Sequence, residues 1–434
     1  MNPTRFALAG TIAAAVAGLT TASQRPGAAC APDNGGITLP AGFCASVYSE
    51  YAGQTRHILV APNGDLFATL GNAAQSSTTK IARLYPDSAA PGLLWLRDTD
   101  GDGRADRSAR LATPTGTGIV LRGNVLYFAS GPSVLRVGID LARFGVWGAI
   151  DTVITGFPEG GHAAKSLAFD AGGALFVGVG SATNTCRLSR TEAAPDPCPE
   201  LGIRSGIWRY SVAQTSQRHP ADGERWATGI RNPLGMTWSV LYGGLYATSH
   251  GRDGLHTLWP QLFTAEKNAE TPSEEFLRVE RGDDYGWPYC YHDRQLGAKV
   301  QAPEYGGNGT TVGRCSGTTA PLVGYPGHWG PNALAIYEGS AFPAKYRGGA
   351  FIAFHGSWNR LPLPEQGYNV VFQPLANGRP SGPFEVFADG FAGDTLEPVH
   401  ARYRPTGLAV APDGALFVAD DMRGRIWRIS WRRP

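Results

Sequence analysis

The chain has 434 residues, of which 42% are hydrophobic and only 17% are charged, and its formal net charge is +2. This composition predicts a well-buried globular protein and excludes a disordered one. The near-neutral charge and the lack of a basic stripe give no reason to expect a nucleic-acid partner.

The N-terminal segment is typical of exported proteins. Residues 1–23 contain Arg5, then an apolar stretch of about 15 residues and small residues at the end, which is the layout of a secretory signal peptide. An N-terminal membrane anchor is the alternative. No later run approaches the roughly 18 apolar residues of a membrane span. We therefore expect residues 24–434 to form a single mature domain in the periplasm or outside the cell.

The cysteines agree with export. An even number of cysteines in an exported chain indicates disulfides, and their spacing makes pairing of neighbours the simplest connectivity: Cys30–Cys44, Cys186–Cys198 and Cys290–Cys315. Cys30 has one other reading, because "GAAC" faintly resembles a lipoprotein acceptor site. The spacing shows no zinc-binding cluster.

The chain repeats one unit, an apolar strand, a glycine-containing turn and a second apolar strand. Such turns are typical of β-hairpins. Repeated strand pairs with irregular loops predict an all-β fold, a six-bladed β-propeller; seven blades or an array of β-sandwiches are the alternatives. The best helix candidate is short and covers residues 259–270. The six units begin at His57, Gly118, Ser166, Gly235, Ala333 and Gly407.

An acidic loop follows the first unit. The stretch "RDTDGDGRADR" places Asp98, Asp100, Asp102 and Asp106 around glycine turns, and alternate carboxylates in such a turn can surround Ca²⁺. The pattern resembles the start of an EF-hand loop but lacks its final glutamate. A calcium ion here would fix a loop between the first and second blades. A solvated acidic turn is the alternative.

Arginines recur at one position of the repeat, just before a strand. Arg56, Arg231 with Asn232, and the alternating Arg402 and Arg404 all lie there. In a propeller these positions converge near one end of the central axis. Clustered guanidinium groups repel one another unless an anion neutralises them, so together they predict a multiply anionic ligand. Taken singly, each also fits a surface position.

Two further segments place polar or aromatic residues near the same end. His162 precedes the strand pair that starts at Ser166, and "AFHGSWNR" carries His355 and Trp358. A tryptophan beside the axis could stack on a flat ligand. The alternatives are a packed histidine and a simple turn with a packed tryptophan.

Taken together, the motifs resemble the soluble quinoprotein sugar dehydrogenases, and most closely their sorbosone and pyranose dehydrogenase branch. The resemblance covers nearly all of the mature chain. It implies a six-bladed propeller that binds pyrroloquinoline quinone (PQQ). The matching stretches are "GHAAKSLAFDAGGALFVGVGS", "GIRNPLGM", "ATSHGRDGL", "RGDDYGWPYCY", "AFHGSWNR" and "RYRPTGLAVAPDGALFVAD".

The resemblance implies roles for individual residues. His162 matches the catalytic base, and Arg231 and Asn232 match the pair at the reactive carbonyl side of the quinone. Arg402 and Arg404 match the arginines that hold its carboxylates.

The resemblance also implies a calcium ion held against the quinone by the backbone carbonyls of Gly251 and Arg252. His355 lies near the place of a basic residue in the glucose enzyme. Two positions depart from that enzyme: Ser181 replaces an aspartate and Arg56 replaces a glutamine. Both put glucose specificity in doubt.

The expected function is oxidation of a sugar by hydride transfer to PQQ, with His162 as general base and calcium as a second cofactor. The substrate would be an aldose, a ketoaldose such as sorbosone, or a pyranose. Electrons would pass to an external acceptor, a cytochrome or a quinone. A calcium-dependent propeller lactonase or hydrolase is one alternative, and a non-catalytic binding propeller is the other.

Overall fold

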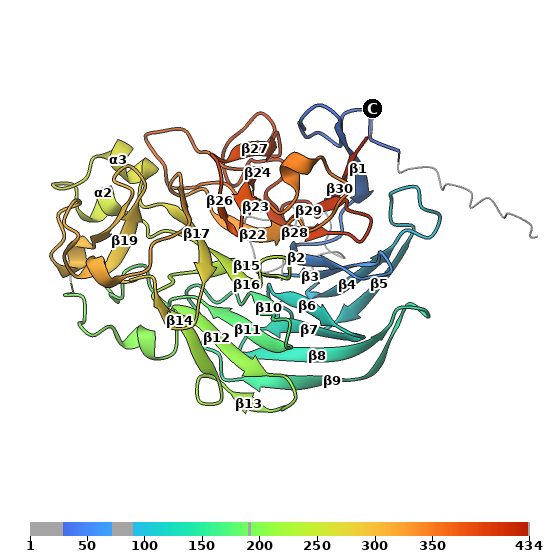
Figure 1. The fold of residues 1–434 in the computed structure, drawn as a ribbon, viewed down its shortest axis with the longest axis horizontal. Coiled ribbons are helices and arrows are strands. Elements are labelled where there is room, and N and C mark those ends of the chain that lie inside the picture. Colours follow the sequence, from blue (N-terminus) through green and yellow to red (C-terminus); the bar gives the residue numbers. More distant parts are fainter. Residues whose placement is uncertain (1–28, 72–89, 190–191, 433–434) are drawn as a thin grey trace, which may run out of the picture.

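The computed structural model describes residues 29–71, 90–189 and 192–432, so the expected signal peptide lies outside the described residues. Strands dominate these ranges (Figure 1). They form six main sheets of four or five strands within the described chain, and we number these sheets as blades 1 to 6 in chain order. The prediction of a six-bladed β-propeller is confirmed.

Blades 1 to 3 occupy the first half of the chain. Blade 1 contains β2 (Thr55–Val60), β3 (Leu66–Leu70), β4 (Gly92–Arg97) and β5 (Arg107–Ala112). Blade 2 contains β6 (Ile119–Arg122), β7 (Val125–Ser130), β8 (Ser133–Asp140), β9 (Gly145–Thr155) and the parallel β13 (Gln217–Arg218). Blade 3 contains β10 (Leu167–Phe169), β11 (Ala174–Val179), β12 (Gly206–Ser211), β14 (Glu224–Thr228) and the parallel β18 (Asp283–Asp284).

Blades 4 to 6 complete the ring. Blade 4 contains β15 (Pro233–Ser239), β16 (Gly244–Ser249), β17 (Glu274–Val279) and β21 (Val323–Tyr325). Blade 5 contains β22 (Pro331–Ile336), β23 (Ala350–Phe354), β24 (Asn369–Gln373) and β27 (Glu385–Ala388). Blade 6 contains β28 (Pro405–Val410), β29 (Leu416–Asp420), β30 (Ile426–Trp431) and β1 (Phe43–Ser49).

The ring closes through its N-terminal strand. β1 pairs antiparallel with β30, from Phe43 opposite Trp431 to Ser49 opposite Ile426, and Figure 1 shows the blue β1 beside the red β30. Joining the two ends of the chain in one blade removes an open edge between them.

Each of the six predicted units supplies the two inner strands of one blade. The turns explain why: the β2–β3 and β28–β29 turns contain Gly64 and Gly414 with φ of 92° and 84°, a region that favours glycine. The innermost strands β2, β6, β10, β15, β22 and β28 all contribute to a central cavity of about 760 Å³.

The hydrophobic core lies between blades rather than at one centre. Within the described residues, six large clusters each join two successive blades. The cluster with Tyr48 and Phe417 from blade 6 and Leu66 and Leu94 from blade 1 closes the ring. The second strands β3, β11, β16, β23 and β29 lie between these clusters and are buried along their whole length.

Long loops carry the remaining elements. The hairpins β19 (Cys290–Asp293) with β20 (Ala298–Gln301) and β25 (Leu375–Ala376) with β26 (Arg379–Pro380) lie outside the blades. Of the helix expected at 259–270, only α3 (Ala265–Glu270) forms, and a second short helix, α2 (Leu255–Leu258), precedes the expected range. Both lie with β19 at the left of Figure 1. Short 3₁₀ turns cover Pro199–Gly202, Pro303–Tyr305, Gly313–Gly317 and Ala344–Tyr346.

All three expected disulfides are present, Cys30–Cys44, Cys186–Cys198 and Cys290–Cys315. The sulfur of Cys30 is therefore bonded to Cys44 rather than available as a lipid acceptor. None of the helices in the described ranges has the length and apolar character that a membrane crossing requires.

The position expected for the acidic loop was wrong. The loop connects β4 and β5 within blade 1, so it does not lie between blades 1 and 2. It contacts blade 6 instead: Ser46 Oγ donates to the Gly103 carbonyl (2.9 Å) and Ala105 N donates to the Tyr48 carbonyl (2.8 Å). The closing strand β1 passes this side of blade 1, which explains the contact.

Candidate functional site

Backbone hydrogen bonds bring the segments before and after the inner strands of blades 3 and 4 together. His162 N donates to the Ser181 carbonyl (2.9 Å) and Ser181 N donates to the Arg231 carbonyl (2.8 Å). Gly180 makes this approach feasible, since a Cβ there would lie 2.6 Å from His162 Cβ and 3.0 Å from Asn232 Oδ1. The structure thus places His162, Arg231 and Asn232 side by side.

The His162 ring is held in one tautomer. Its Nδ1 lies 3.1 Å from the Ser181 carbonyl and 2.9 Å from Ser181 Oγ, which itself donates to the Thr183 carbonyl (2.6 Å). A carbonyl only accepts, so Nδ1 carries the hydrogen and Nε2 keeps its lone pair. Burial, then the positive charge of Arg231, lowers the pKa of His162 to about 3. The imidazole is therefore neutral at pH 7.

Arg231 is clamped by a carboxylate. Its Nη1 donates to the Gly251 carbonyl (2.7 Å) and its Nη2 to Asp253 Oδ2 (2.8 Å). Asp253 Oδ1 also accepts from Asn359 Nδ2 (2.6 Å). Burial opposes the charge of Asp253, but Arg231 and His328 together hold its pKa well below the usual range.

His328 supplies the second cation of this clamp. Its Nε2 lies 2.7 Å from the Asn268 carbonyl and its Nδ1 lies 3.3 Å from Asp253 Oδ1. Both partners only accept, so both ring nitrogens carry hydrogens and the ring is positive. Burial disfavours this charge, yet the hydrogen bond and charge of Asp253 raise the pKa of His328 above its ordinary value.

A second carboxylate clamp forms where blades 5, 6 and 1 meet. Asp421 accepts from Arg56 Nη1 (2.7 Å) and from His355 Nε2 (2.9 Å). Arg404 donates from Nε to the His355 carbonyl and from Nη2 to the Gly356 carbonyl, both at 2.9 Å. Burial and the positive Arg404 lower the pKa of His355 to about 4.

The two clamps are contiguous through one glycine. A Cβ at Gly330 would lie 3.7 Å from His250 Cε1 and 3.8 Å from His355 Cβ. His250 is in turn close enough to Arg231 for that charge to lower its pKa, after burial, to about 4. The site is therefore one polar region at the loops of blades 3 to 6 and 1.

The side chains of three residues expected at the cofactor or metal site do not join the two clamps. Arg402 is exposed, with Nη1 3.7 Å from a Cβ built at Gly36, and shares no hydrogen-bond partner with Arg404 in the described structure. Trp358 is 66% exposed and lines a side cavity. The Arg252 side chain is buried against Glu304, with Nη1 and Nη2 at 2.5 and 3.0 Å from its carboxylate oxygens.

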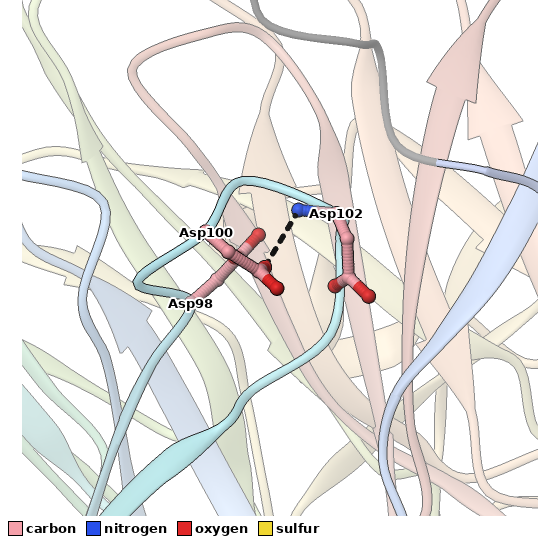
Figure 2. Close-up of side chains that lie close together, drawn as sticks. All are labelled: Asp98, Asp100 and Asp102. Carbon is pink, nitrogen blue, oxygen red and sulfur yellow. Dashed lines mark hydrogen bonds between the residues drawn. The ribbon is translucent and has the colours of Figure 1, made fainter.

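The acidic loop lies apart from this site (Figure 2). Oxygens of Asp98, Asp100 and Asp102 lie within 4.8 Å of one another, and no other group of three potential metal-ligating side chains occurs in the described ranges. Gly101 N and Gly103 N donate to Asp98 (2.6 and 2.8 Å). Asp102 N donates to Asp100 Oδ1 (3.1 Å), the dashed line in Figure 2. Asp106 binds Thr99 N (3.0 Å) and is outside the group.

Sequence reasoning missed the carboxylates of both clamps. Asp253 stands in the quoted stretch "ATSHGRDGL" and Asp421 directly follows the last unit, so a search for an acidic partner of each arginine would have found both. His328 carries no such signal, because it lies in an irregular loop between β21 and β22.

Unpartnered buried atoms test whether PQQ fits. Arg231 Nε, Asn232 Oδ1 and His250 Nε2 are buried and have no hydrogen-bond partner in the protein. A donor and two acceptors that need partners, flanked by Arg56 and Arg404, suit a flat ligand with carbonyls, carboxylates and an N–H. PQQ has these groups, so the residues fit it.

A calcium ion at the Gly251 and Arg252 carbonyls fits less well. Arg231 Nη1 already lies 2.7 Å from the Gly251 oxygen, so a cation on that oxygen would meet a guanidinium charge. In this geometry Arg231 provides the positive charge beside the Gly251 carbonyl.

Solved structures share this fold. The holo pyranose dehydrogenase PQQ domain from Coprinopsis cinerea superimposes with a TM-score of 0.72 and 18% identity, over 93% of this chain and 98% of that chain. The calcium structure of the family AA12 protein from Trichoderma reesei has a TM-score of 0.72 and 18% identity, over 94% and 99%. These similarities define the class of the fold, a six-bladed β-propeller.

The sequence comparison places the chain more narrowly. A family model described as TrAA12-like matches residues 94–432, and the chain belongs to this family. The aldose sugar dehydrogenase YliI of Escherichia coli is 23% identical over 279 residues, which are 60% of this chain and 57% of that protein. The chain spans about half the length of the curated relatives it matches.

Proposed function

We propose that the protein is a PQQ-dependent sugar dehydrogenase. The observation that carries the proposal is His162 with a bare Nε2, set beside Arg231 and Asn232, whose buried Nε and Oδ1 lack partners. The names of similar proteins support it, since they include a pyranose dehydrogenase PQQ domain and an aldose sugar dehydrogenase.

The chain's own residues would hold the cofactor. Arg404 and Arg56 would bind carboxylates of PQQ, and Arg231 and Asn232 would contact its carbonyl edge. His355 would support the carboxylate side, because it holds Asp421, the partner of Arg56. PQQ, when bound, supplies the hydride-accepting carbon for the oxidation.

His162 would take the proton from the sugar hydroxyl at Nε2 while the hydride leaves the same carbon. Ser181 keeps the Nδ1 hydrogen in place, so the reacting nitrogen cannot rotate away. Arg231, fixed by Asp253, would stabilise negative charge that develops on the acceptor's oxygen. The carboxylates of bound PQQ would oppose the positive charge of Arg231. They would therefore raise the low pKa of His162 toward the pH at which a general base works.

The substrate of the proposed reaction is an aldose, a ketoaldose such as sorbosone, or a pyranose, and the acceptor is an external cytochrome or quinone. We propose in addition that Asp98, Asp100 and Asp102 bind a structural calcium ion. The disulfides support a location in the periplasm or outside the cell.

The test is reconstitution with PQQ and calcium, followed by a panel of sugars and an artificial electron-accepting dye. We expect dye reduction that depends on PQQ and on at least one sugar. Absence of both PQQ binding and dye reduction across the panel would overturn the proposal.

The two alternatives receive less support. A hydrolase with a catalytic calcium needs carboxylates around the ion, and in the described ranges the group of three lies in the acidic loop of blade 1. A purely binding propeller would be indifferent to His162→Ala, whereas a dehydrogenase should lose turnover and keep PQQ.

A further inference from the structure

A cavity of about 530 Å³ lies against Asp253. This volume is within the range of small-molecule sites, roughly 300–1,000 Å³. The cavity is built by loops after β11, β16 and β23 and by α2, and its lining includes Asn184, Asp253, His256, Thr257, Trp358, Asn359 and Leu361. Because Asp253 binds Arg231 directly, the cavity adjoins the site described above.

The floor of the cavity offers hydrogen-bonding groups. Asn359 Oδ1 is buried without a partner, while its Nδ2 donates to Asp253. His256 Nδ1 lies 2.8 Å from the Phe263 carbonyl, so Nδ1 carries the hydrogen and Nε2 can accept. Acceptors in this arrangement call for a ligand with several hydroxyl groups.

The charged side chains of the cavity lining, Asp253 and Arg187, each have an oppositely charged partner. The Asp253 carboxylate is paired with Arg231 (2.8 Å) and with the positive His328 (3.3 Å). Arg187, which also lines the cavity, is paired with Glu304 (3.3 Å). Because each of these charges is held in an ion pair, the hydrogen-bonding groups left for a ligand are the neutral amide of Asn359 and the imidazole of His256.

Apolar side chains form the rim. Trp358 is 66% exposed and Leu361 is 77% exposed. Large apolar side chains exposed at the mouth of a polar cavity indicate a binding surface. An indole ring suits the C–H face of a sugar ring, while the amides and the imidazole of the floor suit its hydroxyls.

We propose that this cavity is a second glycosyl subsite, which holds the non-reacting ring of a disaccharide or oligosaccharide while the reacting ring lies at His162. The proposal rests on the proposed function for the reacting ring. It makes the preferred substrate a glycoside rather than a single sugar.

Binding to the cofactor-free protein tests the subsite without oxidation. In calorimetric titrations with glucose, cellobiose and maltose, we expect at least one disaccharide to bind about tenfold more tightly than glucose. Thr257→Trp, on the exposed side of α2, should fill the cavity and remove this difference. Trp358→Ala should reduce it. Gln261→Trp is the matched control, because Gln261 is exposed beside α2 but does not line the cavity.

The PQQ-loaded protein gives the second readout, the ratio of kcat/KM for the tighter disaccharide to that for glucose. We expect Thr257→Trp to lower this ratio about tenfold, and Gln261→Trp to leave it unchanged. Equal binding of glucose and both disaccharides, or a disaccharide preference that survives both Thr257→Trp and Trp358→Ala, would overturn the subsite. Disaccharide binding that responds to Thr257→Trp, in a protein that oxidises no sugar, would support the subsite and refute the dehydrogenase.

Discussion

The two carboxylate clamps use the same device in different surroundings. Asp253 pairs with Arg231 and His328, and Asp421 pairs with Arg56 and His355. The side chain of Asp253 is 33% exposed, and that of Asp421 only 6%. The cations show the reverse order, since Arg231 and His328 are 6% and 3% exposed, whereas Arg56 and His355 are 22% and 18% exposed. The Asp253 clamp therefore neutralises buried cations beside His162, while the Asp421 clamp leaves the Arg56 guanidinium accessible where a ligand would be held.

The largest expected effect is on turnover, and it separates the catalytic role of His162 from the cofactor-binding role of Arg404. His162→Ala should lower turnover about a thousandfold, since it removes the proton acceptor, and should leave PQQ affinity nearly unchanged. Arg404→Ala, at the other clamp, should instead weaken PQQ binding. Steady-state kinetics with saturating PQQ and a direct PQQ titration measure the two quantities. If both variants changed turnover equally and PQQ affinity equally, the separate roles of His162 and Arg404 would be refuted.

Stability should distinguish the two carboxylates next. Asp253→Asn leaves the buried Arg231 and His328 without their counter-charge, so we expect a loss of about 3 kcal/mol in the free energy of unfolding. Asp421→Asn should cost less, because the Arg56 side chain is 22% exposed and His355, with a pKa of about 4, is neutral at pH 7. Urea denaturation at pH 7 compares the two variants. A larger loss for Asp421→Asn would contradict the account.

Acid should weaken the fold through the neutral histidines. The unfolded chain protonates His162 near pH 6.5, but the folded protein does so only near pH 3. Its lowered pKa therefore subtracts stability as the pH falls from 6.5 toward 3, by about 1.4 kcal/mol per pH unit. In His162→Gln the free energy of unfolding should fall less steeply over this window. Urea denaturation at pH 7, 6 and 5 checks this, and identical slopes in both proteins would refute it.

The smallest effect concerns the acidic loop, which lies away from both clamps. Calcium bound by Asp98, Asp100 and Asp102 should raise Tm by a few degrees, and a chelator should reverse the rise. Asp100→Asn should lose most of this response, while the matched Asp106→Asn should keep it, because Asp106 binds Thr99 instead. A Tm that does not change with calcium in the wild-type chain would refute calcium binding by this loop.

Local patterns explain what could be predicted from the sequence. The six hairpins depend on turns of a few residues, so each unit indicated its own strands and their sum indicated the blades. Arg231 and Arg404 precede innermost strands and Arg56 lies at the start of one, and the propeller's symmetry brings such positions together. The acidic loop was recognised from its own residues. Its contact with blade 6 was not, because β1 reaches the loop only when the ring closes.

Long-range partners explain what could not be predicted. Arg56 and Asp421 are 365 positions apart, and His328 and Asp253 are 75 apart. Nothing in the spacing of either pair indicates contact. Alternation also failed to predict the surroundings of Arg402, because it lies in the loop before β28, where the backbone is not a regular strand.

One measurement tests the central claim most directly, an absorbance titration of the cofactor-free protein with PQQ. The account predicts saturable binding at one PQQ per chain, with affinity reduced at least about a hundredfold in the Arg231→Ala, Arg404→Ala double variant. Failure of the wild-type protein to bind PQQ, or equal binding by the double variant, would contradict it.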